Sequence, residues 1–209
     1  MTASPERVSP LGSWSERFAA ASTTADRFAI QEVPFLAQIN LRGDFSDAEF
    51  RAQAAKALGF APPDANSWSG SVERRALWLG PDEWLIVARE EPARLERELR
   101  EGLGRLHHSV VDVSASRTTI ELSGSEARLV LAKGSPLDLH AQAFAPPAMA
   151  QSLLAKAQVI LQALDRRPTF RLFVRSSFAG YLAEWLLDAA AECAASRALD
   201  ARKLAWHLG

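Results

Sequence analysis

The chain has 209 residues, of which 48% are hydrophobic and 23% are charged, a composition typical of a globular protein with a packed core. Its 24 lysines and arginines are balanced by 25 aspartates and glutamates. The formal net charge of −1 argues against a general basic surface for nucleic acid or anionic lipid. No apolar run is long enough to span a bilayer, and the first residues lack the basic and apolar segments of a secretion signal, so we expect neither a membrane span nor a leader.

Motifs for metals and nucleotide cofactors are missing from the sequence. The four histidines form no HExxH helix and no Cys/His cluster, and no glycine-rich loop follows a predicted strand. We therefore expect no metal, flavin or nicotinamide site and no catalytic residue in this chain. The single cysteine, Cys193, lies in the apolar stretch AAECAAS, which predicts a small buried side chain in a protein of the reducing cytoplasm.

The first half reads as a strand, a helix, a hairpin and a second helix. Residues 35–42 alternate apolar and polar side chains, which predicts a strand. Ser46 and Glu49 form a capping box for a helix that ends at Gly59. The stretch 74–88 contains Gly80-Pro81-Asp82-Glu83 and predicts a hairpin, and Pro92 begins a helix whose leucines recur every fourth residue.

The second half repeats this order with different residues. In the strand region 110–124 the apolar positions change phase, which indicates a break near Ser116. Ser123 and Glu126 suggest a second capping box, and residues 153–174 suggest a second hairpin, although periodicity alone would also permit a helix over 148–163. Ser177 then caps a helix, and residues 196–206 predict one more short amphipathic helix.

Two β-α-β-β-α units indicate the α+β class, with a duplicated, ferredoxin-like arrangement of helices on one face of antiparallel sheets. We expect an N-terminal extension over 1–27, a first half over 28–105, a second half over 106–195 and a C-terminal helix or tail over 196–209. If the duplication is real, strand 35–42 superimposes on the strand that ends near Leu122, and hairpin 74–88 superimposes on hairpin 153–174.

The segment DVSASRTT carries the most notable polar side chains. Asp112 and Arg117, with Ser114 and Ser116 between them, could bind a small polar ligand beside the strand break. The structural alternative, which we favour, is an ion pair between Asp112 and Arg117 that closes the bulge, so that Arg117→Ala would lower thermal stability. Asp138 and His140 lie two residues apart, and we expect them to be no acid–base pair.

The six tryptophans fall into two groups. Trp78, Trp84 and Trp185 occupy apolar patterns and are expected in the core. Trp14, Trp68 and Trp206 lie outside the regular patterns, and we interpret them as anchors for a partner protein.

Four segments together resemble the gamma subunit of heterotetrameric sarcosine oxidase: LGPDEWL at 79–85, VVDVSASRTTIELSG at 110–124, VLAKGSPLDLH at 130–140 and FRLFVRSSFAGYLAEWLLDAA at 170–190. The resemblance runs from about residue 9 to about residue 192. It implies a small non-catalytic subunit of a complex that oxidatively demethylates sarcosine to glycine. FAD, FMN, NAD and tetrahydrofolate would then belong to the whole complex, with alpha, beta and delta subunits as partners, and this chain alone would be colourless and inactive.

The second half is also similar to the folate-binding domain of the glycine-cleavage T-protein, through its strand-SG-helix-KG pattern and the ending AEWLLDA. That family has catalytic carboxylates in a glycine-rich segment before the last hairpin. Here the corresponding stretch is LLAKAQVIL at 153–161, which contains neither an acidic residue nor a glycine. The similarity makes a free-standing tetrahydrofolate-dependent aminomethyl carrier the alternative function, and the missing acidic segment argues against it.

Overall fold

The computed structural model describes residues 7–24 and 26–207, with side chains described as far as Cys193. Its strands form two antiparallel five-stranded sheets. Sheet B has the order β3-β4-β5-β2-β6, with bounds Trp68–Gly70, Arg74–Gly80, Glu83–Ala88, Ala37–Gly43 and His108–Asp112. Sheet A has the order β1-β7-β10-β9-β8, with bounds Ala29–Glu32, Arg117–Ser123, Thr169–Arg175, Ala157–Asp165 and Met149–Leu154.

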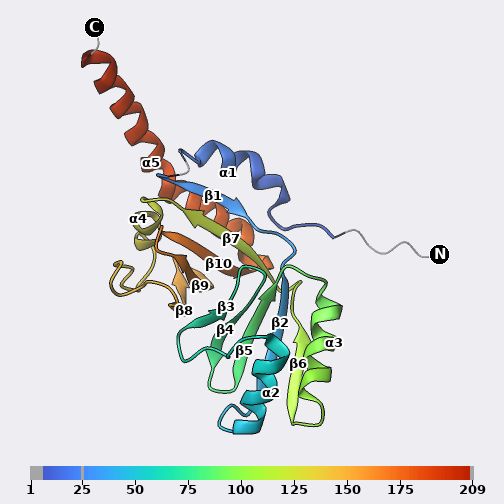
Figure 1. The fold of residues 1–209 in the computed structure, drawn as a ribbon. Coiled ribbons are helices and arrows are strands. Elements are labelled where there is room, and N and C mark those ends of the chain that lie inside the picture. Colours follow the sequence, from blue (N-terminus) through green and yellow to red (C-terminus); the bar gives the residue numbers. More distant parts are fainter. Residues whose placement is uncertain (1–6, 25, 208–209) are drawn as a thin grey trace, which may run out of the picture.

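Helices cover the outer face of each sheet, as Figure 1 shows. Helices α2 (Ala48–Leu58) and α3 (Pro92–Leu103) pack on sheet B, and α1 (Ser15–Ala21), α4 (Ala127–Ala132) and α5 (Ala179–His207) pack on sheet A. Two short 3₁₀ helices, Gly12–Trp14 and Ser176–Phe178, precede α1 and α5. The layers therefore run helix, sheet, sheet, helix, which is an α+β fold.

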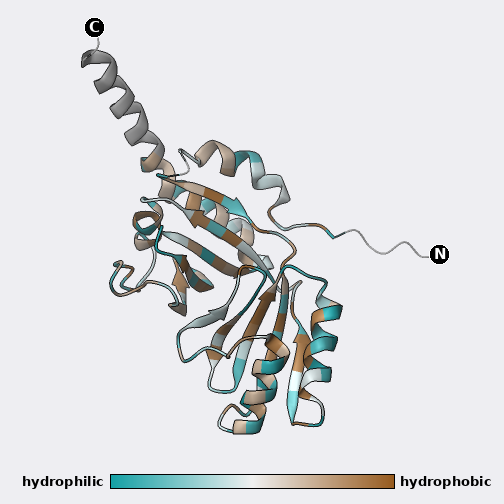
Figure 2. Ribbon diagram, viewed as in Figure 1, coloured by the Kyte–Doolittle hydropathy of each residue, from teal (hydrophilic) through white to brown (hydrophobic). Residues whose placement is uncertain are grey.

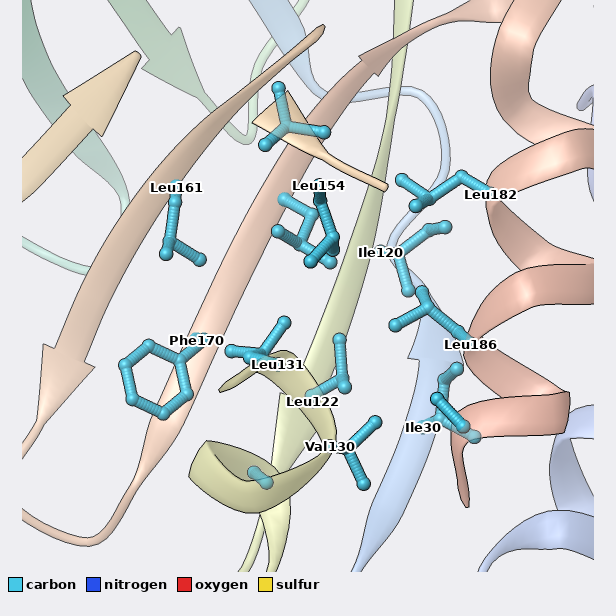
Figure 3. Close-up of a cluster of buried hydrophobic side chains, with 14 of the residues drawn as sticks. Ile30, Ile120, Leu122, Val130, Leu131, Leu154, Leu161, Phe170, Leu182 and Leu186 are labelled. Atoms are coloured by element: carbon cyan, nitrogen blue, oxygen red, sulfur yellow. The ribbon is translucent and has the colours of Figure 1, made fainter. Parts of the chain in front are cut away.

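Apolar residues recur along the strands of both sheets (Figure 2). Their buried side chains form three apolar clusters. The largest lies between sheet A and its helices, where Leu182 and Leu186 of α5 point toward the sheet beside Ile120 (Figure 3). A second lies between sheet B and α2 and α3. The third joins the two sheets face to face and contains Leu36, Leu77, Leu85, Val87, Met149, Ile160 and Phe173.

The two sheets share one connectivity, which supports the predicted duplication. In sheet B, β2 pairs with β5, β5 with β4 and β4 with β3, and in sheet A, β7, β10, β9 and β8 pair in the same sequence. The remaining edge strand, β6 or β1, pairs antiparallel with the first strand of its unit. The sequence analysis missed the strands β1 and β3, and it merged the end of β8 with β9. Superposition of the halves, and their ferredoxin-like character, stay predictions.

The change from one sheet to the other comes later than the expected joint at residue 105. Strand β6 lies beyond that joint and yet completes sheet B, whereas β1 lies at the start of the expected first half and completes sheet A. The reason is hydrogen bonding: β6 occupies the free edge of β2, and β1 occupies the free edge of β7. Sheet A therefore joins the N-terminal strand to four strands that begin at Arg117.

Several local signals were correct. Gly59 ends α2 in the left-handed conformation at φ 84°, and Pro92 starts α3. Strands β4 and β5 flank the Pro81-Asp82 turn. On α3, Arg94 pairs with Glu98 and Arg100 pairs with Glu96, each one helical turn apart.

Both capping boxes were wrong. Asp47, not Ser46, caps α2 by accepting a hydrogen bond from the Glu49 amide, while Ser46 bonds to Asp44. Glu126 precedes α4 without a capping bond and instead accepts from the Arg27 guanidinium at 2.6 Å. Short polar side chains that follow one another compete for the same turn, so spacing alone does not choose the cap.

Two element boundaries also differ from the prediction. Residues 153–161 are not one strand, because a turn at Ala155 and Lys156 separates β8 from β9, with Ala155 at φ 51°. Ser177 lies in a 3₁₀ turn and makes no capping bond, and the helix that follows continues through residues 196–206, where a separate helix was expected.

Candidate functional site at the Asp112–Arg117 loop

The polar segment singled out in the sequence is the crossing between the sheets. Asp112 is the last residue of β6 in sheet B, and Arg117 is the first residue of β7 in sheet A. The phase change near Ser116 is therefore a change of sheet and not a bulge within one strand. Buried Gln38 of β2 fixes the crossing, because its carbonyl accepts from the Val113 amide at 2.8 Å and its side-chain amide donates to the Arg117 carbonyl at 3.1 Å.

Asp112 shapes the turn and does not pair with Arg117. Its Oδ1 accepts from the Ser114 amide at 2.9 Å and from the Ser114 hydroxyl at 2.5 Å. Ser114 Oγ in turn accepts from the Gln38 amide at 2.9 Å. The expected ion pair is thus wrong, because a serine two residues away offers the carboxylate two local donors that need no long side chain.

The Ser116 end of the loop is held by the segment before α5. The Ser176 amide donates to the Ser116 carbonyl at 3.0 Å, and the Ser176 hydroxyl donates to the Ala115 carbonyl at 3.0 Å. The loop is therefore fixed at both ends by main-chain bonds, and the Arg117 side chain takes no part in closing it.

The Arg117 guanidinium is half-buried and has no acidic partner within the described residues. Burial lowers its pKa from the ordinary value, the positive charge of Arg175 lowers it further, and Glu83 opposes the shift. Arg175 lies directly opposite Arg117 in the β7–β10 ladder. Two like charges placed across from one another are destabilising unless an anion lies between them.

Two cavities open beside this loop, and Arg117 lines both. The first, of about 480 Å³, is mainly apolar and is bounded by residues 7–10, Pro34, Phe35, Leu36, Asp112, Ser114, Ala115, Arg117, Thr118 and Ser176. The second, of about 390 Å³, is more polar and is bounded by Arg117, Arg175, Gln151, Ser152, Leu153, Gln158, Val159, Ile160 and Phe173. Arg117 thus lies beside both cavities, at the open end of the interface between the two sheets, which we call the seam.

Residues that the sequence analysis missed hold the N-terminal segment over the first cavity. The Glu32 carboxylate accepts from the hydroxyls of Thr118 and Ser9, which ties β7 to residues 7–10. Phe35 follows Pro34 at φ 59° with 53% of its surface exposed, an unusual conformation for a bulky side chain. No motif marks either residue; an exposed aromatic within a strand pattern was the only available signal.

The tryptophan predictions divide. Trp84 is buried and Trp78 and Trp185 pack against core clusters, as expected. Trp14 is partly buried against the sheet A cluster, with the Arg17 guanidinium 4.3 Å from its ring centre. Trp68 connects the sheets, donating from Nε1 to the Ala163 carbonyl at 2.7 Å. Side chains near Trp206 lie outside the described residues, so the role of all three as partner anchors stays a prediction.

The other reactive candidates have structural environments. The Asp138 carboxylate accepts from the His140 amide at 2.9 Å, so these residues form a local turn. Cys193 is buried, and burial, together with the neighbouring Glu126 carboxylate, raises the pKa of its thiol to about 11. A thiol of that pKa is a poor nucleophile at neutral pH.

The fold and these residues can be compared with known proteins. Residues 42–192 match the family model "Sarcosine oxidase, gamma subunit family". Sarcosine oxidase subunit gamma of Corynebacterium sp. (strain P-1) is 37% identical over 189 residues, covering 90% of this chain and 92% of the relative. The corresponding subunit of an Arthrobacter species is 37% identical over 190 residues, covering 90% and 92%.

Solved structures agree with this relationship. A chain of heterotetrameric sarcosine oxidase from Corynebacterium sp. U-96, in complex with pyrrole 2-carboxylate, superimposes with a TM-score of 0.81 at 34% identity, covering 89% of this chain and 95% of that one. Glycine cleavage system aminomethyltransferase T from Bartonella henselae matches with a TM-score of 0.58 at 17% identity, covering 85% of this chain and 49% of that one, which shows a shared fold.

None of the described helices has the length and apolar character that a membrane crossing requires. The family match covers most of the chain, and the curated relatives are matched over nearly their whole length. The chain belongs to the sarcosine oxidase gamma subunit family.

Proposed function

We propose that this chain is the gamma subunit of a heterotetrameric sarcosine oxidase and supports the catalytic subunits without supplying reacting groups. The observation that carries the proposal is the TM-score of 0.81 over 95% of a chain from such an enzyme. The loop geometry is in keeping with a supporting role. The Asp112 carboxylate bonds to Ser114, and the Ser114 hydroxyl bonds to Gln38 of β2, so both side chains hold the sheet crossing in place.

The complex would oxidatively demethylate sarcosine to glycine, with alpha, beta and delta subunits as partners of this chain. FAD, FMN, NAD and tetrahydrofolate are assigned by this proposal to the other subunits. Neither cavity beside Arg117 fits a dinucleotide, because neither is lined by a glycine and a bound pyrophosphate favours a glycine-rich turn at a helix start. We therefore derive no step of the reaction through these groups.

A free-standing aminomethyl carrier is the less supported function. Residues 153–161, which occupy the place of the acidic segment, form the end of β8, the β8–β9 turn and the first part of β9. Their side chains are apolar, amide or basic, so this hairpin offers no carboxylate for proton transfer. A cytoplasmic location is part of the main proposal and rests on the buried free thiol of Cys193.

The test is co-expression of the tagged chain with the remaining subunits, followed by affinity purification and an assay of sarcosine oxidation. We expect all four subunits to elute together with activity, and we expect the chain expressed alone to be colourless and inactive. A stoichiometric flavin absorbance from the isolated chain, or an active enzyme that assembles equally well without it, would contradict the proposal.

A further inference from the structure

The strands β7 and β10 carry two cross-strand pairs of charged residues, and only one of these pairs contains an acidic residue. Arg171 and Glu121 lie directly opposite one another, four residues along the same strands, and form an ion pair at 2.8 Å. The Glu121 carboxylate also accepts from Gln31 at 3.0 Å. Arg175 and Arg117 occupy the same kind of cross-strand position at the mouth of the seam, and there both side chains are cationic.

Neither cation at the mouth forms an ion pair within the described residues, although the charge of Glu83 favours the charged form of Arg117. The guanidinium groups of Arg117 and Arg175 make no hydrogen bond or ion pair to a described side chain. Both line the cavity of about 390 Å³, where Gln151, Ser152 and Gln158 add polar groups. A guanidinium pair facing one opening is suited to a carboxylate, which accepts bidentate bonds from arginine.

One large, exposed apolar side chain lines this opening, and two more follow Arg175 closely in the chain. Leu153, at the cavity rim, is 48% exposed, and Phe178 and Tyr181 are 44% and 40% exposed with ring centres 6.4 Å apart. Tyr181 contacts the β8–β9 turn, shortly after Leu153 in the chain, because its hydroxyl accepts from the Lys156 amide at 3.3 Å. Arginine and aromatic residues gathered around a desolvated centre are typical of protein interfaces.

We propose that Arg117, Arg175, Leu153, Phe178 and Tyr181 form a docking patch for an acidic segment of another subunit, whose carboxylate enters between the two arginines. The inference rests on the proposed function, since it requires a partner subunit. Charge complementarity selects the partner chemistry: an inserted carboxylate turns the repulsive Arg117–Arg175 pair into two ion pairs, and an adjoining apolar side chain covers the exposed rings. A small carboxylate ion alone would leave Leu153, Phe178 and Tyr181 uncovered.

The experiment measures binding of this chain to the complex of the remaining subunits. The test variant carries Arg117→Gln and Arg175→Gln. The matched control carries Arg166→Gln and Arg167→Gln, which removes two exposed charges in the β9–β10 turn, at the opposite end of β10 from Arg175. We expect the dissociation constant of the test variant to rise about 30-fold and that of the control to stay within about twofold.

A second measurement separates docking from folding. The melting temperature of the isolated test variant should equal or exceed that of the wild type, because the substitutions remove a like-charge contact. Arg175→Gln alone, at an exposed position, should give a smaller loss of affinity in the same direction.

Unchanged affinity of the test variant, an equal loss in the control, or a melting temperature well below wild type would overturn the inference. So would a small carboxylate that binds the isolated wild-type chain stoichiometrically and prevents assembly. Failure of the wild type and the control alike to join the other subunits would instead refute the proposed function.

Discussion

The two ends of the β7–β10 ladder use the same cross-strand geometry for opposite purposes. Arg171 and Glu121 neutralise one another deep in the seam, where Arg171 is only 5% exposed. Arg175 and Arg117 repel one another at the open end. In the Arg171–Glu121 pair, each charge is compensated within the fold. In the Arg175–Arg117 pair, the positive charge is left available to a partner. The two pairs lie on the same two strands, so their position along the strands distinguishes the structural pair from the candidate binding pair.

The largest expected effect comes from breaking the buried pair. Arg171→Met leaves the Glu121 carboxylate without its cation, and we expect the free energy of unfolding to fall by about 3 to 5 kcal/mol, with Gln31 offsetting a small part. Urea denaturation of the isolated chain measures this. Arg42→Met, which breaks an exposed pair with Asp82, is the control and should leave the midpoint nearly unchanged.

A fourth arginine, contributed by sheet B, sharpens the comparison. Arg75 is 3% exposed, one of its Nη atoms has no partner, and burial lowers its pKa to about 10, helped by the charge of Arg171. Because its positive charge is poorly compensated, we expect Arg75→Met to raise the free energy of unfolding by about 1 kcal/mol despite the lost contact with Trp68. If Arg75→Met instead lowered the free energy of unfolding by about 1 kcal/mol, the positive charge of Arg75 would be stabilising, as that of Arg171 is.

A neutral contact across the same seam should have an effect of similar size and opposite sign. Trp68→Phe keeps an aromatic ring but removes the Nε1 donor to the Ala163 carbonyl, and we expect a loss of about 1 kcal/mol. Thermal unfolding followed by circular dichroism would detect it. No measurable change would mean that solvent replaces this bond readily.

The smallest effect is expected at the open end. Arg117→Gln in the isolated chain should change the melting temperature little, and upward if at all, because the Asp112 carboxylate bonds to Ser114 and loses no partner. Differential scanning calorimetry of the variant and wild type provides the test. A clear decrease would restore the structural role that the sequence alone suggested for this arginine.

Sequence reasoning succeeded where the signal is local and failed for the contacts of Asp112 and Arg117. The alternation in residues 35–42, the Pro81 turn and the phase change near Ser116 each depend on neighbours in the chain, and each was placed correctly. The partner of Asp112 was not predicted correctly, because the sequence alone does not tell whether a carboxylate bonds to a nearby serine or to a more distant arginine. The opposition of Arg117 and Arg175 depends on strand register between segments 58 residues apart (175 − 117), which no local pattern encodes.

The assignment of strands to sheets lies beyond local pattern for the same reason. Residues 29–32 and 108–112 are short segments whose own sequences do not specify which sheet edge they will occupy. Only the complete set of strands shows that β2 and β7 each need an antiparallel neighbour.

Sheet A takes its edge strand β1 from a part of the chain that precedes all of sheet B, and this order has a consequence for synthesis on the ribosome. All five strands of sheet B lie within residues 37–112 and can pair as soon as that stretch has emerged, but β1 must wait for β7, with Gln31 and Glu121 separated by 90 positions. At ordinary elongation rates the delay is on the order of 5 to 20 seconds. During that interval Ile30 and its neighbours are without their sheet, so the N-terminal strand is the segment on which a nascent-chain chaperone would have the longest time to act.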